Sequence, residues 1–373
     1  MWYRFDSQAS RQDRSISRAA VAMLAIAALT GTLALSGCGS DTPSGPDDPD
    51  PPVPLASPPP DAAAALATIT EADLAARVGI VADDSTLGRA TPSPELVEVA
   101  MYLASEFDRL GLLGDDQDAA MCTERGVPDD YCPYLQWYTA APTDTAPALN
   151  VVARLPGSDP GVADEYVLVG AHFDHLGVGI PVAGDSIYNG ADDNGSGTAG
   201  VLELAEAFTA LATPPRRTII FVFFSAEERG LLGSQYYVLH AAVPTNNVVA
   251  MVNLDMIGRN WTDRVAGISQ LDSDIFERSD RVADAYPSLN MDLISDPWPN
   301  EQLLIRSDQA PFIPYRIPVM FLTSGTDHAD YHRPSDEADR IDYEKTARLT
   351  KLVFRLLWEF AETTVLPGFP VTP

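Results

Sequence analysis

Several carboxylate and imidazole side chains of this 373-residue chain follow runs of apolar residues, where ligands of α/β sheets bind. The side chains in this pattern are His172, Asp174, Glu227, Glu228, Asp255 and His332. A single polar residue after a strand is ordinary turn chemistry, but imidazoles and carboxylates at successive strand ends are hard to satisfy except around cations. This mixed ligand set suits zinc, with manganese or cobalt as alternatives. A calcium site would use oxygen ligands and would not need the histidines.

The glycine-rich segment Asn189–Gly197, with the sequence NGADDNGSG, supplies a carboxylate that two metal ions could share. Two metal ions about 3.5–4 Å apart need such a shared ligand, which is usually a carboxylate. Asp192 and Asp193 both stand in this turn. The sequence therefore predicts a two-metal site that could hydrolyse a bond.

The elements that must position these side chains alternate between strand and helix patterns. Unbroken apolar runs, typical of strands buried on both faces, occur at Tyr166–Gly170, Thr218–Phe224, Val248–Leu254 and Ile317–Leu322. Helical spacing occurs at Pro94–Leu112, Thr198–Leu211, Gly230–His240 and Tyr343–Phe360. We expect an irregular stretch at Gly114–Thr145. The alternation predicts a three-layer α/β/α domain with a mixed, mostly parallel central sheet, whose strand ends converge on one crevice.

Five segments resemble, in the same order, the signature stretches of the bacterial di-zinc aminopeptidases, the family of the secreted leucyl aminopeptidases. These segments are GAHFDHLG, NGADDNGSG, FSAEERGLLGS, NLDMIG and DYHRPSD. The resemblance extends over about residues 150–360. It implies a zinc-exopeptidase fold and a metallopeptidase that hydrolyses N-terminal peptide bonds of peptides or proteins, using a water that bridges two zinc ions.

The resemblance also implies a metal ligand at five positions of this chain. Asp193 would bridge the two zinc ions, His172 and Asp255 would complete one site, and Glu228 and His332 would complete the other. Three neighbours could replace these ligands as far as spacing is concerned. His175 is close to His172, His328 precedes His332 by four residues, and Asp192 adjoins Asp193.

Three further roles are implied by the resemblance. Glu227 would be the general base, and Asp174 would orient the imidazole of His172. Tyr331 would stabilise the oxyanion of the reaction, with simple packing as the alternative. The chain departs from many relatives at Ser307–Gln309, where a Ser-Asp-His triplet is usual, because Gln309 cannot carry a proton.

Three other functions remain open at this point. A carboxypeptidase of the same fold would need a cation for the substrate carboxylate, for which Arg306 and Arg333 are candidates. A glutaminyl cyclase of the same fold would use one zinc ion. A lipoprotein of this fold that is a binding module without catalysis would typically have lost metal ligands or the general base.

The charge of the chain argues against one class of partner. With 53 Asp and Glu against 24 Lys and Arg, the formal net charge is −29. Nucleic-acid binding needs clustered cations, so we expect no nucleic-acid partner. We expect a monomer.

The N-terminus has the order of a secretory signal. Arginines at positions 4, 11, 14 and 18 precede an apolar run over 19–35, which ends at Leu35-Ser36-Gly37-Cys38. The end of this segment resembles the lipobox of bacterial lipoproteins, which implies lipidation of Cys38; an uncleaved signal anchor is the alternative. The predicted organisation is a signal peptide over 1–37, a Pro- and Asp-rich tether over 38–61, a peptidase domain over 62–365 and a tail over 366–373.

The predicted location is outside the cytoplasm. We expect the protein to be exported and held to a membrane by the lipid, facing the periplasm or the cell exterior. An exported compartment permits oxidation, so we predict a disulfide between Cys122 and Cys132.

Overall fold

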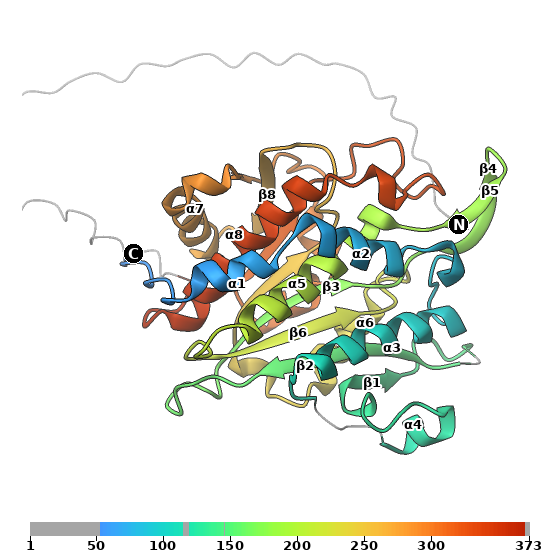
Figure 1. Ribbon diagram of the computed structural model, residues 1–373, viewed down its shortest axis with the longest axis horizontal. Coiled ribbons are helices and arrows are strands. Elements are labelled where there is room, and N and C mark those ends of the chain that lie inside the picture. The colour runs from blue at the N-terminus through green and yellow to red at the C-terminus, as the bar shows by residue number, and fades with distance from the viewer. Residues whose placement is uncertain (1–52, 115–118, 145, 370–373) are drawn as a thin grey trace, which may run out of the picture. The chain divides into compact units, whose positions relative to one another are not determined.

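The computed structural model describes residues 53–114, 119–144 and 146–369 (Figure 1). The predicted signal peptide, Cys38 and the first part of the tether lie outside the described residues. Within the described residues, no helix combines the length and apolar character that a membrane span requires.

Eight strands of the described chain form one mixed sheet in the order β1-β2-β6-β3-β7-β10-β8-β9. They are β1 (Leu135–Tyr138), β2 (Ala148–Leu155), β3 (Tyr166–His172), β6 (Thr218–Phe224), β7 (Val248–Leu254), β8 (Arg264–Ser269), β9 (Asp292–Ser295) and β10 (Val319–Thr323). The central strands β6, β3, β7 and β10 run parallel, and β2 and β8 pair antiparallel with β6 and β10. This arrangement confirms the predicted mixed, mostly parallel sheet.

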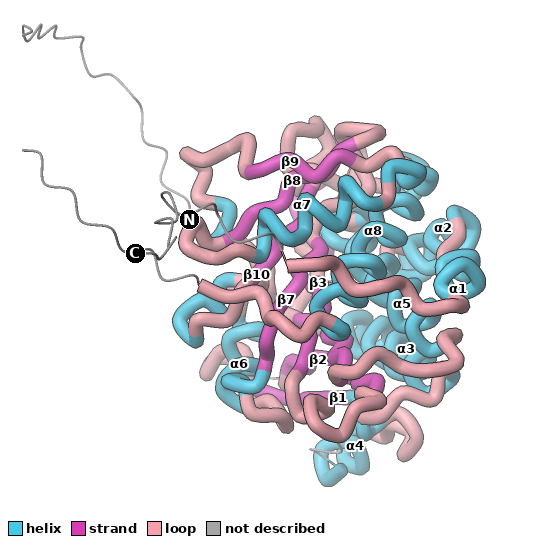
Figure 2. The backbone as a smooth tube through the Cα atoms, turned by 90° about the vertical axis from the view of Figure 1, so that its left-hand side faces the viewer, coloured by secondary structure: helices cyan, strands magenta, loops and turns pink. Residues whose placement is uncertain are grey.

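Helices cover both faces of the sheet, as predicted. They are α1 (Ala62–Thr68), α2 (Glu71–Val81), α3 (Pro94–Arg109), α4 (Ala119–Arg125), α5 (Gly197–Thr209), α6 (Leu232–His240), α7 (Ile275–Ala285) and α8 (Tyr343–Glu362). Figure 2 shows α3, α5 and α8 on one side of the strands and α6 on the other. The α6 side is completed by the short 3₁₀ segment Ala310–Tyr315, whose Phe312 packs against Phe224 and Tyr237.

The local sequence explains why the central elements form. All seven residues of β6 are buried, as its unbroken apolar run predicts. Helix α3 begins where the Ser93 side chain accepts a hydrogen bond from the Leu96 amide, with Pro94 in the first turn. Its apolar face, with Leu103 and Phe107 among its members, is buried against the core. These elements hold the strand ends that carry the site.

The stretch 114–145, predicted to be irregular, contains helix α4 and strand β1. The prediction was wrong. Strand β1 has only four residues, too few for a visible pattern, and it forms by pairing with β2, where Leu135 lies opposite Val151. The prediction of a disulfide between Cys122 and Cys132 is confirmed, with a Cα–Cα distance of 5.8 Å. This bond joins α4 to the residues that lead into β1.

Two other features were not expected from the sequence. The hairpin of β4 (Gly177–Val182) and β5 (Asp185–Tyr188) extends from the edge of the domain (Figure 1). The last residues of the predicted tether lie against α8, where the Ala56 amide donates to Glu359 at 2.6 Å and the Trp358 indole donates to the Ser57 carbonyl at 2.9 Å. This part of the tether is therefore packed on the domain.

Candidate metal centre

The carboxyl ends of the parallel strands and the loops that follow them bring the predicted site residues together. His172 is the last residue of β3, Asp255 directly follows β7, and the loop after β6 carries Glu227 and Glu228. A single pocket is lined by these residues and by Asp193, Tyr331 and His332. Asp174, the remaining predicted residue, is completely buried behind the pocket.

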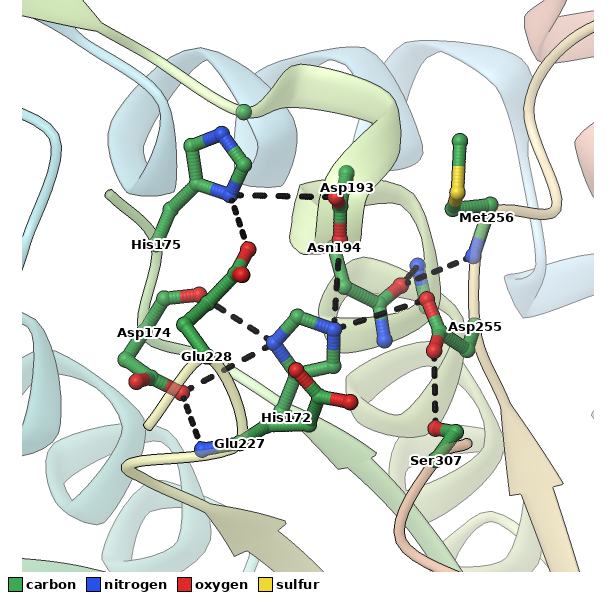
Figure 3. Close-up of polar contacts among 12 residues, drawn as sticks. His172, Asp174, His175, Asp193, Asn194, Glu227, Glu228, Asp255, Met256 and Ser307 are labelled. Carbon is green, nitrogen blue, oxygen red and sulfur yellow. Dashed lines mark hydrogen bonds and ion pairs between the residues drawn. The ribbon is translucent and has the colours of Figure 1, made fainter. Parts of the chain in front are cut away.

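Asp193 lies between two groups of side chains and directs one carboxylate oxygen to each. Figure 3 shows it between His172 and His175. Its Oδ1 is 3.3 Å from His172 Nε2, which is 3.4 Å from Asp255 Oδ1. Its Oδ2 is 3.1 Å from His332 Nε2, which is 3.5 Å from Glu228 Oε1. Such a carboxylate could be shared by two metal ions.

The three alternative ligands take different places in the structure. His175 lies inside the site, with Nδ1 2.8 Å from Glu228 Oε1 and 3.9 Å from Asp193 Oδ2. His328 and Asp192 instead lie next to each other, with His328 Nε2 3.3 Å from Asp192 Oδ2. The glycine-rich loop thus presents Asp193 to the pocket and Asp192 to a buried histidine.

The donor set fits a cation. Within the part of the chain that the structure describes, Asp255 Oδ1 is buried and receives no hydrogen bond, while Ser307 donates to its Oδ2 at 2.7 Å. A buried carboxylate oxygen without a partner is costly, and a metal ion would remove this cost. The ligand atoms of His172, Asp193 and Asp255 lie within 4.8 Å of one another, and so do those of a second group, His175, Asp193 and Glu228.

The charges in the pocket are strongly coupled. Burial raises the pKa of Glu227 well above its usual range, and the neighbouring carboxylates of Asp308 and Asp255 add to this. Burial alone would lower the pKa of His172, but Asp255 and Glu227 outweigh it and hold that pKa well above the usual range. Negative charge dominates the site, as expected where a cation is to be bound.

Asp174 contacts both Glu227 and His172. Its Oδ1 accepts a hydrogen bond from the Glu227 amide at 3.2 Å, and its Oδ2 accepts one from Thr91 at 2.9 Å. The His172 ring nitrogen Nδ1 is 3.2 Å from the backbone carbonyl of Asp174 and 3.7 Å from its carboxylate. The imidazole therefore has two oriented partners, and the nearer is the carbonyl.

Tyr331 lies on the wall of the pocket. Its ring stacks on His332, with 3.9 Å between ring centroids, and burial raises the pKa of its hydroxyl. The phenol is therefore protonated at neutral pH and can act as a hydrogen-bond donor.

Gln309, where the resemblance led us to expect a histidine, takes part in a buried hydrogen-bond network. Its Oε1 accepts from Asn253 at 2.9 Å and its Nε2 donates to the Leu303 carbonyl at 3.1 Å. Asn253 also donates to Ser307, the residue that holds Asp255. A neutral amide, with both a donor and an acceptor, satisfies the partners in this network.

Sequence reasoning assigned no role to two further groups at the site. Asp308 is completely buried, and burial raises its pKa to about 7. Arg89 is also completely buried, behind the loops that carry His175 and Asp193. Asp308 stands in the triplet Ser307–Gln309, whereas Arg89 belongs to no motif quoted above, and only the folded chain brings Arg89 to the site.

Similar proteins were found by sequence and by structure. The model of "Peptidase family M28" matches residues 150–357. A "Probable leucine aminopeptidase" of Arthroderma benhamiae is 32% identical over 216 residues, which cover 55% of this chain and 57% of the relative. "Leupeptin-inactivating enzyme 1" of Streptomyces exfoliatus is 29% identical over 256 residues, with 63% and 53% covered. The chain thus spans little more than half the length of these curated relatives.

Solved structures share the fold. LapB from Legionella pneumophila has a TM-score of 0.62 at 22% identity, with 83% of this chain and 77% of that chain covered. The glutaminyl cyclase of Porphyromonas gingivalis has a TM-score of 0.59 at 19% identity, with 77% and 97% covered. Since the family model covers more than half of the chain and the fold agrees, this chain belongs to peptidase family M28.

Proposed function

We propose that this protein is a zinc-dependent aminopeptidase that removes N-terminal residues from peptides. The observation that carries the proposal is the position of Asp193, whose two oxygens face two separate histidine–carboxylate groups within one pocket. The relatives named as leucine aminopeptidases and zinc metalloproteases support the same activity.

Two zinc ions fit this donor set. Asp193 would be their shared ligand; His172 and Asp255 would hold one ion, and Glu228 and His332 the other. Zinc bound there would polarise the scissile carbonyl and lower the pKa of a water molecule. His175 would donate a hydrogen bond to Glu228 and so orient that ligand.

The side chains of the pocket supply the proton transfers. Glu227 would accept a proton from the attacking water and pass it to the leaving amine, since its carboxylate lies in the pocket and its backbone is fixed by Asp174. Tyr331 would donate a hydrogen bond to the oxyanion that develops on the carbonyl oxygen.

The N-terminal direction is favoured by what the pocket offers a substrate. Arg306 is the one Lys or Arg among the described residues that line it, and Arg333 is not among them. The Arg306 side chain is 52% exposed, with its guanidinium 3.9 Å from Glu301. A carboxypeptidase would need a cation committed to the substrate carboxylate, and Arg306 is poorly held for that purpose.

A glutaminyl cyclase is the second candidate, because the cyclase structure is covered over 97% of its length. The two activities differ in metal content and in product. Such a cyclase would use one zinc ion and would release ammonia from N-terminal glutamine, whereas the aminopeptidase would hold two ions and release free amino acids.

The test uses the purified full chain with zinc restored, its metal content measured, and leucine p-nitroanilide as substrate. We expect about two zinc ions per chain, hydrolysis of the free substrate and no hydrolysis of its N-acetylated form. Failure with every apolar and basic amino-acid nitroanilide, with zinc or cobalt, would reject the proposal. Cyclisation of glutaminyl peptides at one zinc per chain would replace it with the cyclase.

We also propose that the protein is exported and anchored through a lipid on Cys38, with the catalytic domain acting outside the cytoplasm. The charged, apolar and small-residue order of the first 38 residues supports this location. Metabolic labelling with a fatty acid should mark the wild-type chain and not C38S; labelling of both would reject the anchor.

A further inference from the structure

The short segment Gly88–Thr91, which we call the Arg89 segment, lies beside the loop that follows β3. The Gly177 amide donates to the Gly88 carbonyl at 3.0 Å and the His175 amide donates to the Arg89 carbonyl at 3.4 Å. Ala90 pairs with His175 as in a parallel sheet. The family match begins only at residue 150, so this segment reaches the site from outside the matched region.

The side chain of Arg89 is completely buried and donates to backbone carbonyls on three separate parts of the chain. Its Nε donates to the Phe173 carbonyl at 2.7 Å, between His172 and the other histidine of that loop. Its Nη2 donates to the Gly190 carbonyl at 2.7 Å and lies 3.5 Å from the Asp193 carbonyl. The remaining donors reach the carbonyls of Asn189 and Val81.

These contacts join the two loops that carry the first group of ligands. The planar guanidinium has donors in a fixed fork, so it sets the spacing between the carbonyls it binds. One of these loops directly follows His172, the last residue of β3, and the other carries Asp193; the side chains of these two residues are 3.3 Å apart. A single lysine nitrogen could not reach carbonyls on both loops in this way.

The guanidinium also adds positive charge behind the acidic pocket, and it does so without hydrogen-bonding to the side chains of the proposed metal ligands. Its nearby carboxylates include those of Asp193, Asp174 and Glu228, which act on it through space. Its hydrogen bonds, however, go to carbonyl oxygens within the described residues. The carboxylate oxygens of the site therefore stay available for a cation.

The Arg89 segment holds a third loop as well. Thr91 accepts a hydrogen bond from the Ala226 amide at 3.0 Å and donates to Asp174 at 2.9 Å. Ala226 directly precedes Glu227. The same four residues thus contact the loops of His172, Asp193 and Glu227.

We propose that Arg89 is a positioning residue of the metal centre, which fixes the loop after β3 and the glycine-rich loop relative to each other and thereby sets the geometry of metal binding. The inference rests on the proposed metal site and goes beyond it, since it assigns a role to a residue upstream of the matched family region. Arg89 contacts neither the substrate nor the metal in this account.

The test compares R89K and R89M with matched variants of a second buried arginine. Arg77 is 6% exposed and contacts Glu106, Glu203 and Glu206 on α3 and α5. Both arginines are buried in polar networks, but Arg77 does not touch the site loops. R77K and R77M therefore control for the loss of a buried guanidinium as such.

The measurements are zinc affinity, by competition with a chelator of known affinity, and the visible absorption spectrum of the cobalt-loaded full chain. We expect R89K and R89M to bind zinc about 10–100-fold more weakly and to shift the cobalt spectrum. R77K and R77M should lower the unfolding temperature and leave both readouts at wild-type values.

Wild-type zinc affinity and an unchanged cobalt spectrum in R89K would overturn the proposal, as would equal losses in R77K. If R89M does not fold, the R89K and R77K pair decides the question. Neither readout needs turnover. A chain that binds zinc normally and hydrolyses nothing would reject the proposed function and leave the Arg89 test intact.

Discussion

The carboxylate of Glu227 is held in the metal pocket by a backbone contact that does not use the carboxylate itself. Its amide donates to Asp174, while its side chain lines the pocket next to the proposed ligand Glu228. The side chain is thus free for proton transfer, and its neighbour is free for metal binding. Adjacent residues of one chain can serve both purposes because the loop after β6 directs both side chains to the same cavity.

Replacing this base should separate catalysis from metal binding. In E227Q we expect kcat to fall by about 10²–10⁴-fold, because an amide cannot accept the proton of the attacking water. Zinc content, measured by atomic absorption, should stay at the wild-type value. The control is E165Q, which removes a carboxylate near Arg217 and should leave kcat unchanged. Activity of E227Q within threefold of wild type would show that another group is the base.

The two histidines that contact Glu228 should differ in metal binding. The His332 side chain is 35% exposed and lies 3.1 Å from Asp193, whereas His175 is buried and lies 3.9 Å from it. We expect H332Q to lower the zinc content by about one ion per chain, and H175Q to keep both ions with weaker affinity. The opposite pattern would make His175 the ligand and His332 its neighbour.

At the residue scale, the sequence was informative where chemistry is concentrated in short motifs. The residues singled out by their position after apolar runs line one pocket, apart from Asp174 behind it, and Asp193 of the glycine-rich segment lines it with them. Arg89 and Thr91 could not be found in this way. A lone arginine in a sequence does not indicate which carbonyls it will bind, because its partners come from loops about 84 to 104 positions away.

At the element scale, the strands that could be predicted were those buried on both faces of the sheet. The runs at Thr218–Phe224 and Val248–Leu254 coincide with β6 and β7, because central parallel strands are apolar throughout. The short strands β1 and β9 have four residues each and lie at the two edges of the sheet. Their formation depends on a partner strand, and no periodicity can develop over so few residues.

Helix α8 carries a lysine whose charge the fold disfavours. Lys345 is completely buried near the first turn, where its ammonium donates to the Arg259 carbonyl at 2.8 Å and to Ser324. Burial lowers its pKa from 10.5 to about 8, although Asp192 and Asp342 oppose the change. Folding therefore prefers the neutral amine.

This lysine gives a stability change with a defined sign. Between pH 8 and 10.5 the unfolded chain binds more protons at this position than the folded chain, so its contribution to stability rises with pH. The contribution of Lys345 to the free energy of unfolding is complete above pH 10.5 and is lost as the pH falls to 8. The free energy of unfolding of wild type relative to K345M should thus increase by up to about 3 kcal/mol across this window.

Denaturant unfolding at fixed metal content measures the difference at each pH. The variant K351M, on the same helix with a partly exposed side chain, controls for the loss of a lysine charge. A difference between wild type and K345M that stays constant from pH 8 to 10.5 would contradict the assigned titration.

At the scale of the whole molecule, the site joins the ends of the four central strands of the large sheet. Its residues come from the ends of β3, β6 and β7 and from loops that follow β5 and β10. These loops are far apart in the sequence and converge on a region rich in carboxylates. Their repulsion must be balanced when the protein folds, partly by buried cations such as Arg89 and, if the proposed site is occupied, partly by the metal.

Removing the metal should therefore lower stability as well as activity. The carboxylates of Asp193, Glu227, Glu228 and Asp255 line one pocket, and burial makes their mutual repulsion stronger than it would be in water. A ligand that binds only the folded state stabilises it by about 4 kcal/mol when present at roughly 1,000 times its dissociation constant. Dialysis against a chelator should abolish hydrolysis and lower the unfolding temperature, and zinc or cobalt should restore both. Calcium, which prefers all-oxygen sites, should restore neither.

The unfolding temperature of E227Q should respond to chelation as strongly as that of wild type, because this variant keeps the proposed metal ligands. A metal-free chain that unfolds at the same temperature as the zinc-loaded chain would show that the loops hold their carboxylates together without a cation.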